Sequence, residues 1–176
     1  AMSEKAWKAS ERSNLPKFYL NLKSYRKSLL SNSNPYTPAV NLVFALDEAL
    51  KMMREEGLDN IFNRHNKHKL AMSNAAKALN LKLFADEKSL SPSITALKTG
   101  EMDAEEFRKI IKNKFDILLA GGQDHLKGRI FRVGHLGYVN DRDIITVISA
   151  ISNTLLNLGK ISAAQAGEAL VVASKY

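Results

Sequence analysis

A short apolar run enclosed by glycines constrains the fold of this chain more than any other stretch. Residues 120–138 read AGGQDHLKGRIFRVGHLGY and contain five of the 9 glycines among 176 residues. The run IFRV at residues 130–133 lies between two of these glycines, and β-branched and aromatic residues bounded by glycine predict a β-strand. Because alternate side chains of a strand face opposite ways, Arg132 shares a face with Ile130. We therefore expect one guanidinium on a defined face of a strand.

Two environments suit Arg132. The guanidinium either stays solvated on an open sheet face or points at an anion in a cleft. The residues alone favour the solvated state, because an arginine on the solvent side of a strand is common. A planar guanidinium can also hold a carboxylate through two parallel hydrogen bonds, so the second interpretation stays open.

The rest of the chain alternates amphipathic and short apolar segments. Hydrophobic spacing and start and stop residues predict helices over about 4–12, 39–56, 58–80, 103–114, 140–158 and 163–174. Short strands are predicted over 80–84, 91–97, 115–119 and 130–133, and an irregular, partly helical connector over 17–30. The fold class is therefore α+β, with a small, mostly antiparallel sheet and helices packed on one of its faces.

The segment that most strongly interrupts regular secondary structure is SNSNPYTP at residues 31–38. Thr37 is placed to cap the helix that follows, with Pro38 at the first helical position. An exposed helix N-terminus also offers free amide donors to a phosphate, so the same place suits an anion. Capping alone would explain Thr37 equally well.

Composition limits the classes of function. The chain has no cysteine, which excludes disulfides and thiolate chemistry and fits a reducing cytoplasm. No apolar run approaches the roughly 18 residues that cross a membrane, so we expect a soluble protein without a membrane partner. The formal charge is +8, but the basic residues are spread along the chain in runs of at most two, which argues against a nucleic-acid partner.

Two histidines at helical spacing raise the question of a metal. His65 and His68 are three residues apart, but no acidic residue or further histidine stands near them in the sequence. We interpret them as a core-edge and a surface histidine and predict no metal site. Asp141 and Asp143 lie in the first turn of a predicted helix, where their charge favours the helix dipole rather than catalysis.

The glycine-rich stretch resembles a known signature. GRIFRVGHLG, preceded by AGGQ, is similar to the C-terminal signature of the class V (fold type I) aminotransferases that depend on pyridoxal phosphate (PLP), in particular the alanine–glyoxylate/serine–pyruvate aminotransferase group. The resemblance implies that Arg132 binds the α-carboxylate of the substrate. Homologues of this group are also known as the small subunit of a soluble hydrogenase.

A second segment carries the same resemblance. NPYTP at residues 34–38 is similar to the family's segment that reaches across the dimer to the cofactor phosphate of the partner subunit. The resemblance implies that Thr37 contributes its hydroxyl to that phosphate. Asn34 stands where some relatives have tyrosine, and Tyr36 is the candidate substitute for the missing aromatic contact. SPSITA at residues 91–96 also resembles a family segment.

The resemblance covers the whole chain but only the last half or less of the family's polypeptide. It implies that residues 1–36 are a connector from a missing large domain and that residues 37–176 are the C-terminal small domain. The catalytic lysine, which forms a Schiff base with PLP, would then precede this chain, which holds no catalytic residue. We expect the fragment to bind no cofactor and to be inactive, whereas the intact homodimer transfers an amino group from an alanine- or serine-type donor to a glyoxylate- or pyruvate-type acceptor.

Two other classes of function stay open. One is a non-catalytic scaffold or interaction subunit, associated with a hydrogenase, that reuses the half-fold. The other is a basic nucleic-acid-binding domain. The sequence does not specify the amino donor and acceptor.

Overall fold

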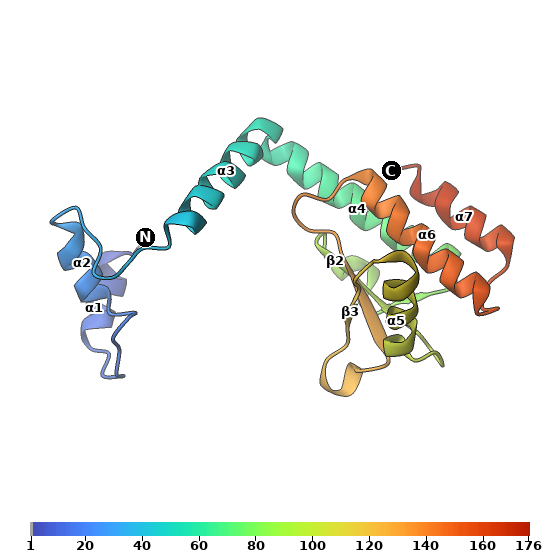
Figure 1. The fold of residues 1–176 in the computed structure, drawn as a ribbon, viewed down its shortest axis with the longest axis horizontal. Coiled ribbons are helices and arrows are strands. Elements are labelled where there is room, and N and C mark those ends of the chain that lie inside the picture. The colour runs from blue at the N-terminus through green and yellow to red at the C-terminus, as the bar shows by residue number, and fades with distance from the viewer. Residues whose placement is uncertain (1) are drawn as a thin grey trace. The chain divides into compact units, whose positions relative to one another are not determined.

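The computed structural model describes residues 2–176 and divides the chain into two compact units. The first ends at Glu55 and the second spans Glu56–Tyr176 (Figure 1). The domain boundary that the sequence predicts, between residues 36 and 37, is not tested by this division and stays a prediction.

The first unit consists of helices joined by loops. They are α1 (Glu4–Glu11), α2 (Leu22–Leu29) and α3 (Val40–Glu56), whose last residue belongs to the second unit. Ser3 caps α1 by accepting a hydrogen bond from the Ala6 amide, and Asn21 caps α2 by accepting from the Lys23 amide. The predicted connector is partly helical because it contains α2.

The predicted cap of α3 at Thr37 is wrong by two residues. The first main-chain bond of the helical type runs from the Val43 amide to the Ala39 carbonyl, at 3.1 Å, so the cap position is Ala39 and not Thr37. The reason lies in the turn before it, where the Val40 amide donates to the Pro38 carbonyl at 2.9 Å. That tight turn delays the helix past the proline, and Thr37 lies exposed outside it.

The second unit contains a four-stranded sheet. Its strands are β1 (Lys82–Leu83), β2 (Ile94–Lys98), β3 (Ala120–Gly121) and β4 (Ile130–Gly134), in the order β1-β2-β4-β3. Each neighbouring pair is antiparallel. The predicted small antiparallel sheet is confirmed, and so is the strand that carries Arg132.

The strand predicted over 115–119 is wrong. Helix α5 continues to Phe115 and ends at Asp116, which adopts the left-handed conformation with φ 55°. Pairing with β4 starts only at Ala120. The apolar residues 117–119 therefore connect α5 to β3 and do not pair with the sheet themselves.

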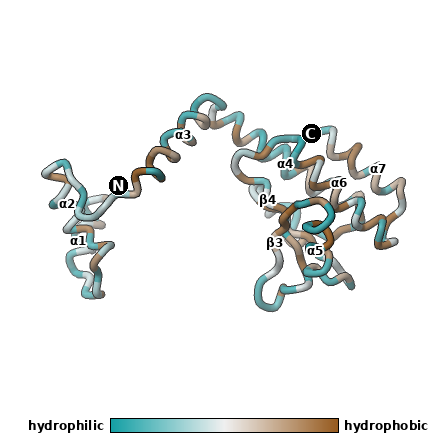
Figure 2. Tube along the Cα trace, in the orientation of Figure 1, coloured by the Kyte–Doolittle hydropathy of each residue, from teal (hydrophilic) through white to brown (hydrophobic). Residues whose placement is uncertain are grey.

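Four helices complete this unit. They are α4 (Leu58–Ala78), α5 (Ala104–Phe115), α6 (Asp141–Asn157) and α7 (Ala163–Ala173). Helix α4 packs against α6, α7, β1 and β2, while α5 packs against α6, β3 and β4. Capping boxes begin α6 at Asn140 and α7 at Ser162. Figure 2 shows the apolar segments of these helices in brown.

The two faces of the sheet differ. On β4, Phe131 and Val133 are buried in the hydrophobic core with Leu97 of β2, whereas Arg132 and its neighbour Ala120 are less covered. The helices thus cover one face, as predicted, and Arg132 lies on the other. Within residues 2–176 no helix is both long and apolar enough to cross a membrane.

Candidate functional site

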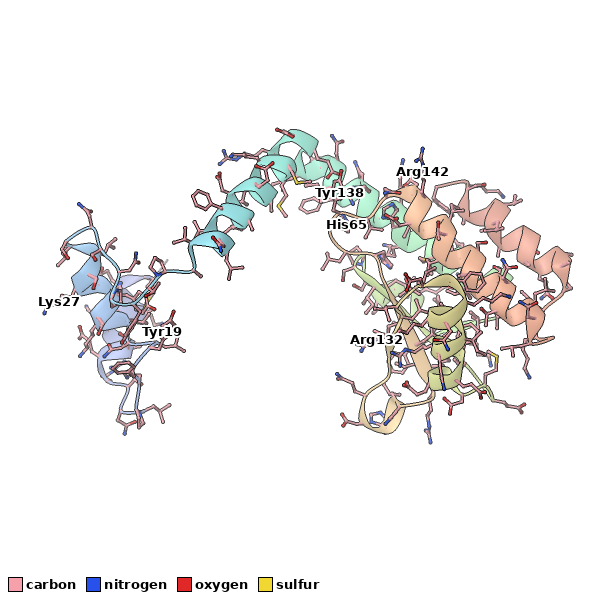
Figure 3. The ribbon with its side chains drawn as sticks, in the orientation of Figure 1. Tyr19, Lys27, His65, Arg132, Tyr138 and Arg142 are labelled. Carbon is pink, nitrogen blue, oxygen red and sulfur yellow. The ribbon has the colours of Figure 1, made fainter. Side chains whose placement is uncertain are left out.

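Arg132 is held in the middle of β4, on the more open face of the sheet (Figure 3). Its neighbours in register are Ala96 on β2 and Ala120 on β3. Directly opposed residues of antiparallel strands share a face, so the residues beside Arg132 on that face both have small side chains. Its Nε donates a hydrogen bond to the Gly121 carbonyl at 2.9 Å. This bond uses one of five N–H donors and orients the planar group.

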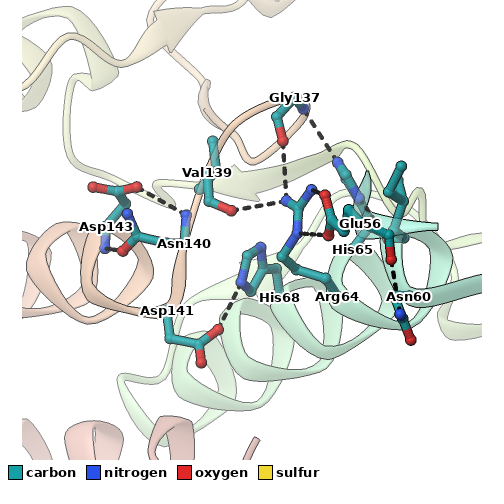
Figure 4. Close-up of polar contacts among 11 residues, drawn as sticks. Glu56, Asn60, Arg64, His65, His68, Gly137, Val139, Asn140, Asp141 and Asp143 are labelled. Atoms are coloured by element: carbon teal, nitrogen blue, oxygen red, sulfur yellow. Dashed lines mark hydrogen bonds and ion pairs between the residues drawn. The ribbon is translucent and has the colours of Figure 1, made fainter. Parts of the chain in front are cut away.

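The loop that follows β4 is tied to helix α4 (Figure 4). Arg64 of α4 donates from Nη1 to the carbonyls of Gly137 and Val139, at 3.0 and 2.8 Å. Its Nε and Nη2 face the two carboxylate oxygens of Glu56 at 2.6 and 2.8 Å. The hydrogen bonds to Arg64 lower the pKa of Glu56, and those to Glu56 raise the pKa of Arg64. The pair therefore stays charged.

His65 and His68 each serve in these contacts rather than pointing at a common ion. The Nε2 of His65 lies 3.1 Å from the Gly137 amide, and the Nε2 of His68 lies 2.9 Å from a carboxylate oxygen of Asp141. His65 is 8% exposed, which fits its predicted place at the edge of the core. Among residues 2–176 no three His, Cys, Asp or Glu side chains gather as a metal site.

The prediction that His68 is a surface residue is wrong, because only 2% of it is exposed. Its ring bonds to Asp141 at the start of α6, 73 residues later in the chain. The spacing of residues along α4 cannot predict the bond between His68 and Asp141, because Asp141 belongs to another helix.

His135 was not predicted as a structural residue. It is fully buried, with Nδ1 3.0 Å from the Pro92 carbonyl and Nε2 2.9 Å from the Thr95 hydroxyl. Its pKa is lowered to about 4, chiefly by burial and to a smaller extent by the nearby His68 and His65. The only feature of the sequence that could have indicated a structural role for His135 is its position directly after Gly134, the last residue of β4.

The three predicted phosphate ligands belong to the first unit. Asn34 and Thr37 are exposed. The hydroxyl of Tyr36 donates to the Phe18 carbonyl at 2.9 Å, and its ring stacks on Tyr19 with centroids 4.8 Å apart. The amide of Asn34 and the hydroxyl of Thr37 are donors of the kind that bind phosphate, whereas Tyr36 would have to release Phe18 first.

The chain is similar to several known proteins. No family model matches the chain. It is 52% identical over 159 residues to the soluble hydrogenase 42 kDa subunit of Anabaena cylindrica, and the match covers 90% of this chain and 42% of that protein. It is 30% identical over 183 residues to serine–glyoxylate aminotransferase of Methylorubrum extorquens, covering 99% of this chain and 45% of that protein.

A solved structure agrees with the sequences. The crystal structure of ureidoglycine–glyoxylate aminotransferase from Bacillus subtilis superposes with a TM-score of 0.87 at 27% identity, over 98% of this chain and 46% of that one. The aminotransferases among its relatives and structural neighbours are of class V. The chain spans less than half of the length of the relatives it matches, and the match fits a C-terminal portion of the alanine/serine–glyoxylate type. The resemblance inferred from GRIFRVGHLG and NPYTP is confirmed at the level of the family.

Proposed function

We propose that this chain forms the substrate-carboxylate side of a PLP-dependent aminotransferase. Arg132 carries the proposal, because its guanidinium lies on the less covered sheet face and is oriented by a single bond to Gly121. The Nη groups then offer the parallel pair of N–H donors that a carboxylate accepts. An amino acid and a 2-oxo acid both carry this carboxylate, so one arginine serves both substrates.

The cofactor is PLP, which supplies the electron sink for transamination when it is bound. On this chain Thr37 and Asn34 would hold its phosphate, since both are exposed and carry suitable donors. Tyr36 is the weaker candidate because its hydroxyl bonds to Phe18. Residues 1–36 would connect to the large domain and residues 37–176 would form the small domain, with the covalent lysine outside this chain. The 176-residue chain alone would then be inactive.

The proposed substrates are an amino acid of the alanine or serine type and a 2-oxo acid of the glyoxylate or pyruvate type. Support comes from the relatives, whose names include serine–glyoxylate and ureidoglycine–glyoxylate aminotransferases. We further propose a homodimer, so that Thr37 reaches the phosphate of the partner subunit, and a cytoplasmic location.

A test of the proposal uses the full-length protein from which this chain is proposed to come. Replacing Arg132 by Ala should raise KM for the amino acid and for the 2-oxo acid together, because both lose the same contact. Arg132→Lys keeps the charge but not the planar pair of donors, so it should restore only part of the loss. The matched control is Arg129→Ala, at an exposed arginine three residues earlier. Unchanged KM values in Arg132→Ala would contradict the role.

One relative favours a second candidate. The soluble hydrogenase 42 kDa subunit of Anabaena cylindrica is 52% identical to this chain, and its name describes an assembly rather than a transaminase. A scaffold of that kind would bind its partner without PLP. A full-length protein that binds no PLP, yet is retained by a hydrogenase complex, would support this candidate. Nucleic-acid binding, the third candidate from the charge of +8, would show as salt-sensitive retention on nucleic acid.

A further inference from the structure

Behind the Arg132 strand, helix α5 holds strand β3 with a charged pair. Arg108 donates from Nε to the Leu119 carbonyl and from Nη1 to Glu105, both at 2.7 Å. Both side chains come from α5 and are only partly exposed. One carboxylate oxygen of Glu105 is buried and has no hydrogen-bond partner within the described residues. The pair is thus bonded to Leu119, the residue just before β3 begins.

Gly121 lies between this pair and Arg132. It is opposite Phe131 in register, so a side chain at this position would point toward the helices. The side chain of Arg132 extends from the other face. A Cβ at Gly121 would lie 2.5 Å from Nη1 of Arg108 and 2.6 Å from Oε1 of Glu105. The pair therefore packs directly on the glycine backbone. Arg132 binds the carbonyl of the same residue.

Strand β3 needs such support. It is two residues long and lies at the edge of the sheet, where β4 is its neighbour. Two residues of ladder pairing hold an edge strand weakly. The Arg108 bond to Leu119 adds a charge-assisted contact just before the start of β3. The Arg132 bond to Gly121 adds another at the last residue of β3. A shift of β3 would therefore move the carbonyl that orients the Arg132 guanidinium.

We propose that Arg108 and Glu105 are positioning residues for Arg132, acting through Leu119 and Gly121. They touch no substrate. Their role is to keep the Gly121 carbonyl where it aligns the guanidinium for a carboxylate. This inference rests on the proposed function only for the ligand of Arg132, because the positioning itself is a property of the chain.

The first readout is independent of function. In the 176-residue chain, solvent exchange of the Arg132 Nε–H proton, followed by NMR, reports the bond to Gly121. Arg108→Ala should speed this exchange about tenfold, the effect of losing about one net hydrogen bond. Gly121→Ala keeps both charged side chains but pushes their ends away from β3, so it should give the same change. Arg129→Ala should leave the exchange as it is, and a dispersed amide spectrum should verify folding of each variant.

The second readout tests the consequence for the substrate. In the full-length protein, Arg108→Ala and Gly121→Ala should raise KM for the amino acid about tenfold, with a smaller change in kcat. Arg108→Lys should recover part of the affinity, because an ammonium can reach the Leu119 carbonyl but cannot replace the planar fork.

The outcomes separate the two proposals. Unchanged Nε–H exchange in both Arg108→Ala and Gly121→Ala would overturn the positioning role, whatever the kinetics. Faster exchange with unchanged KM would support the positioning role and contradict the assignment of Arg132 to the substrate. Faster exchange together with a raised KM would support both.

Discussion

His65 accepts a hydrogen bond from the Gly137 amide, with 3.1 Å between its Nε2 and the amide nitrogen. Its Nδ1 lies 2.8 Å from the Ile61 carbonyl, an acceptor, so that nitrogen carries the proton. The ring must therefore be neutral to make both bonds. Helix α4 thus holds the loop that leaves the Arg132 strand, across 72 positions of sequence.

Replacing His65 by Ala should loosen this loop without unfolding the unit. The Gly137 amide loses its acceptor, and because Gly137 is exposed and water can replace that acceptor, the cost is about 0.5–1.5 kcal/mol. We expect faster hydrogen exchange at Gly137, while amides in the core of α6 keep their protection. His125→Ala, at an exposed histidine, is the control. Equal Gly137 exchange in both variants would show that the His65 contact does not hold the loop.

Arg64 should contribute more than an ordinary surface arginine. It joins Glu56 to two carbonyls of the same loop, so Arg64→Ala removes contacts to three residues at once. We expect a loss of about 2 kcal/mol in the free energy of unfolding, since a hydrogen bond to a charged group contributes about 1.5–3 kcal/mol net and partial exposure of the ion pair reduces its share. Urea denaturation of Arg64→Ala beside Arg142→Ala, an exposed arginine on α6, measures the difference. Equal midpoints would contradict the prediction.

Because His135 is buried, the free energy of unfolding should decrease at acidic pH. Its pKa is about 4 in the folded chain against an ordinary value of 6.5. Between these values the unfolded chain binds a proton that the folded chain does not, so stability falls as pH drops from 6.5 toward 4. The full contribution is about 3 kcal/mol, at 1.36 kcal/mol per pKa unit.

Urea curves at pH 7 and pH 4.5 measure this dependence. His135→Asn should be less stable at pH 7 but should lose less stability on acidification than the unsubstituted chain. His125→Asn should keep the original pH dependence, because His125 is exposed. A His135→Asn variant with the original dependence would mean that another group is responsible.

Local signals in the sequence predicted much of the fold. Asn140 and Ser162 cap their helices with partners three residues away, so their own segments contain the information. The strand at Ile130–Gly134 follows from its glycine boundaries and its apolar run. The position of Arg132 on the less covered face follows from the alternation of that strand.

Features that depend on distant contacts could not be predicted in this way. His68 lies on a helix that packs against α6 and α7 and bonds to Asp141 of α6, and Arg108 and Glu105 of another element approach the backbone of Gly121 too closely for a Cβ. The error at Thr37 is of a different kind. The turn at Pro38 delays the helix to Val40, and capping preference does not contain that geometry.

Cofactor absorbance tests the central claim most directly. PLP is added to the 176-residue chain, to the full-length protein and to its Arg132→Ala variant, and each is then titrated with an amino acid. The account predicts a cofactor band in both full-length proteins and none in the chain alone. It also predicts that Arg132→Ala needs a much higher amino-acid concentration to change the band, whereas Arg129→Ala does not. A full-length protein without a band, or an Arg132→Ala variant that responds like the unsubstituted protein, would contradict it.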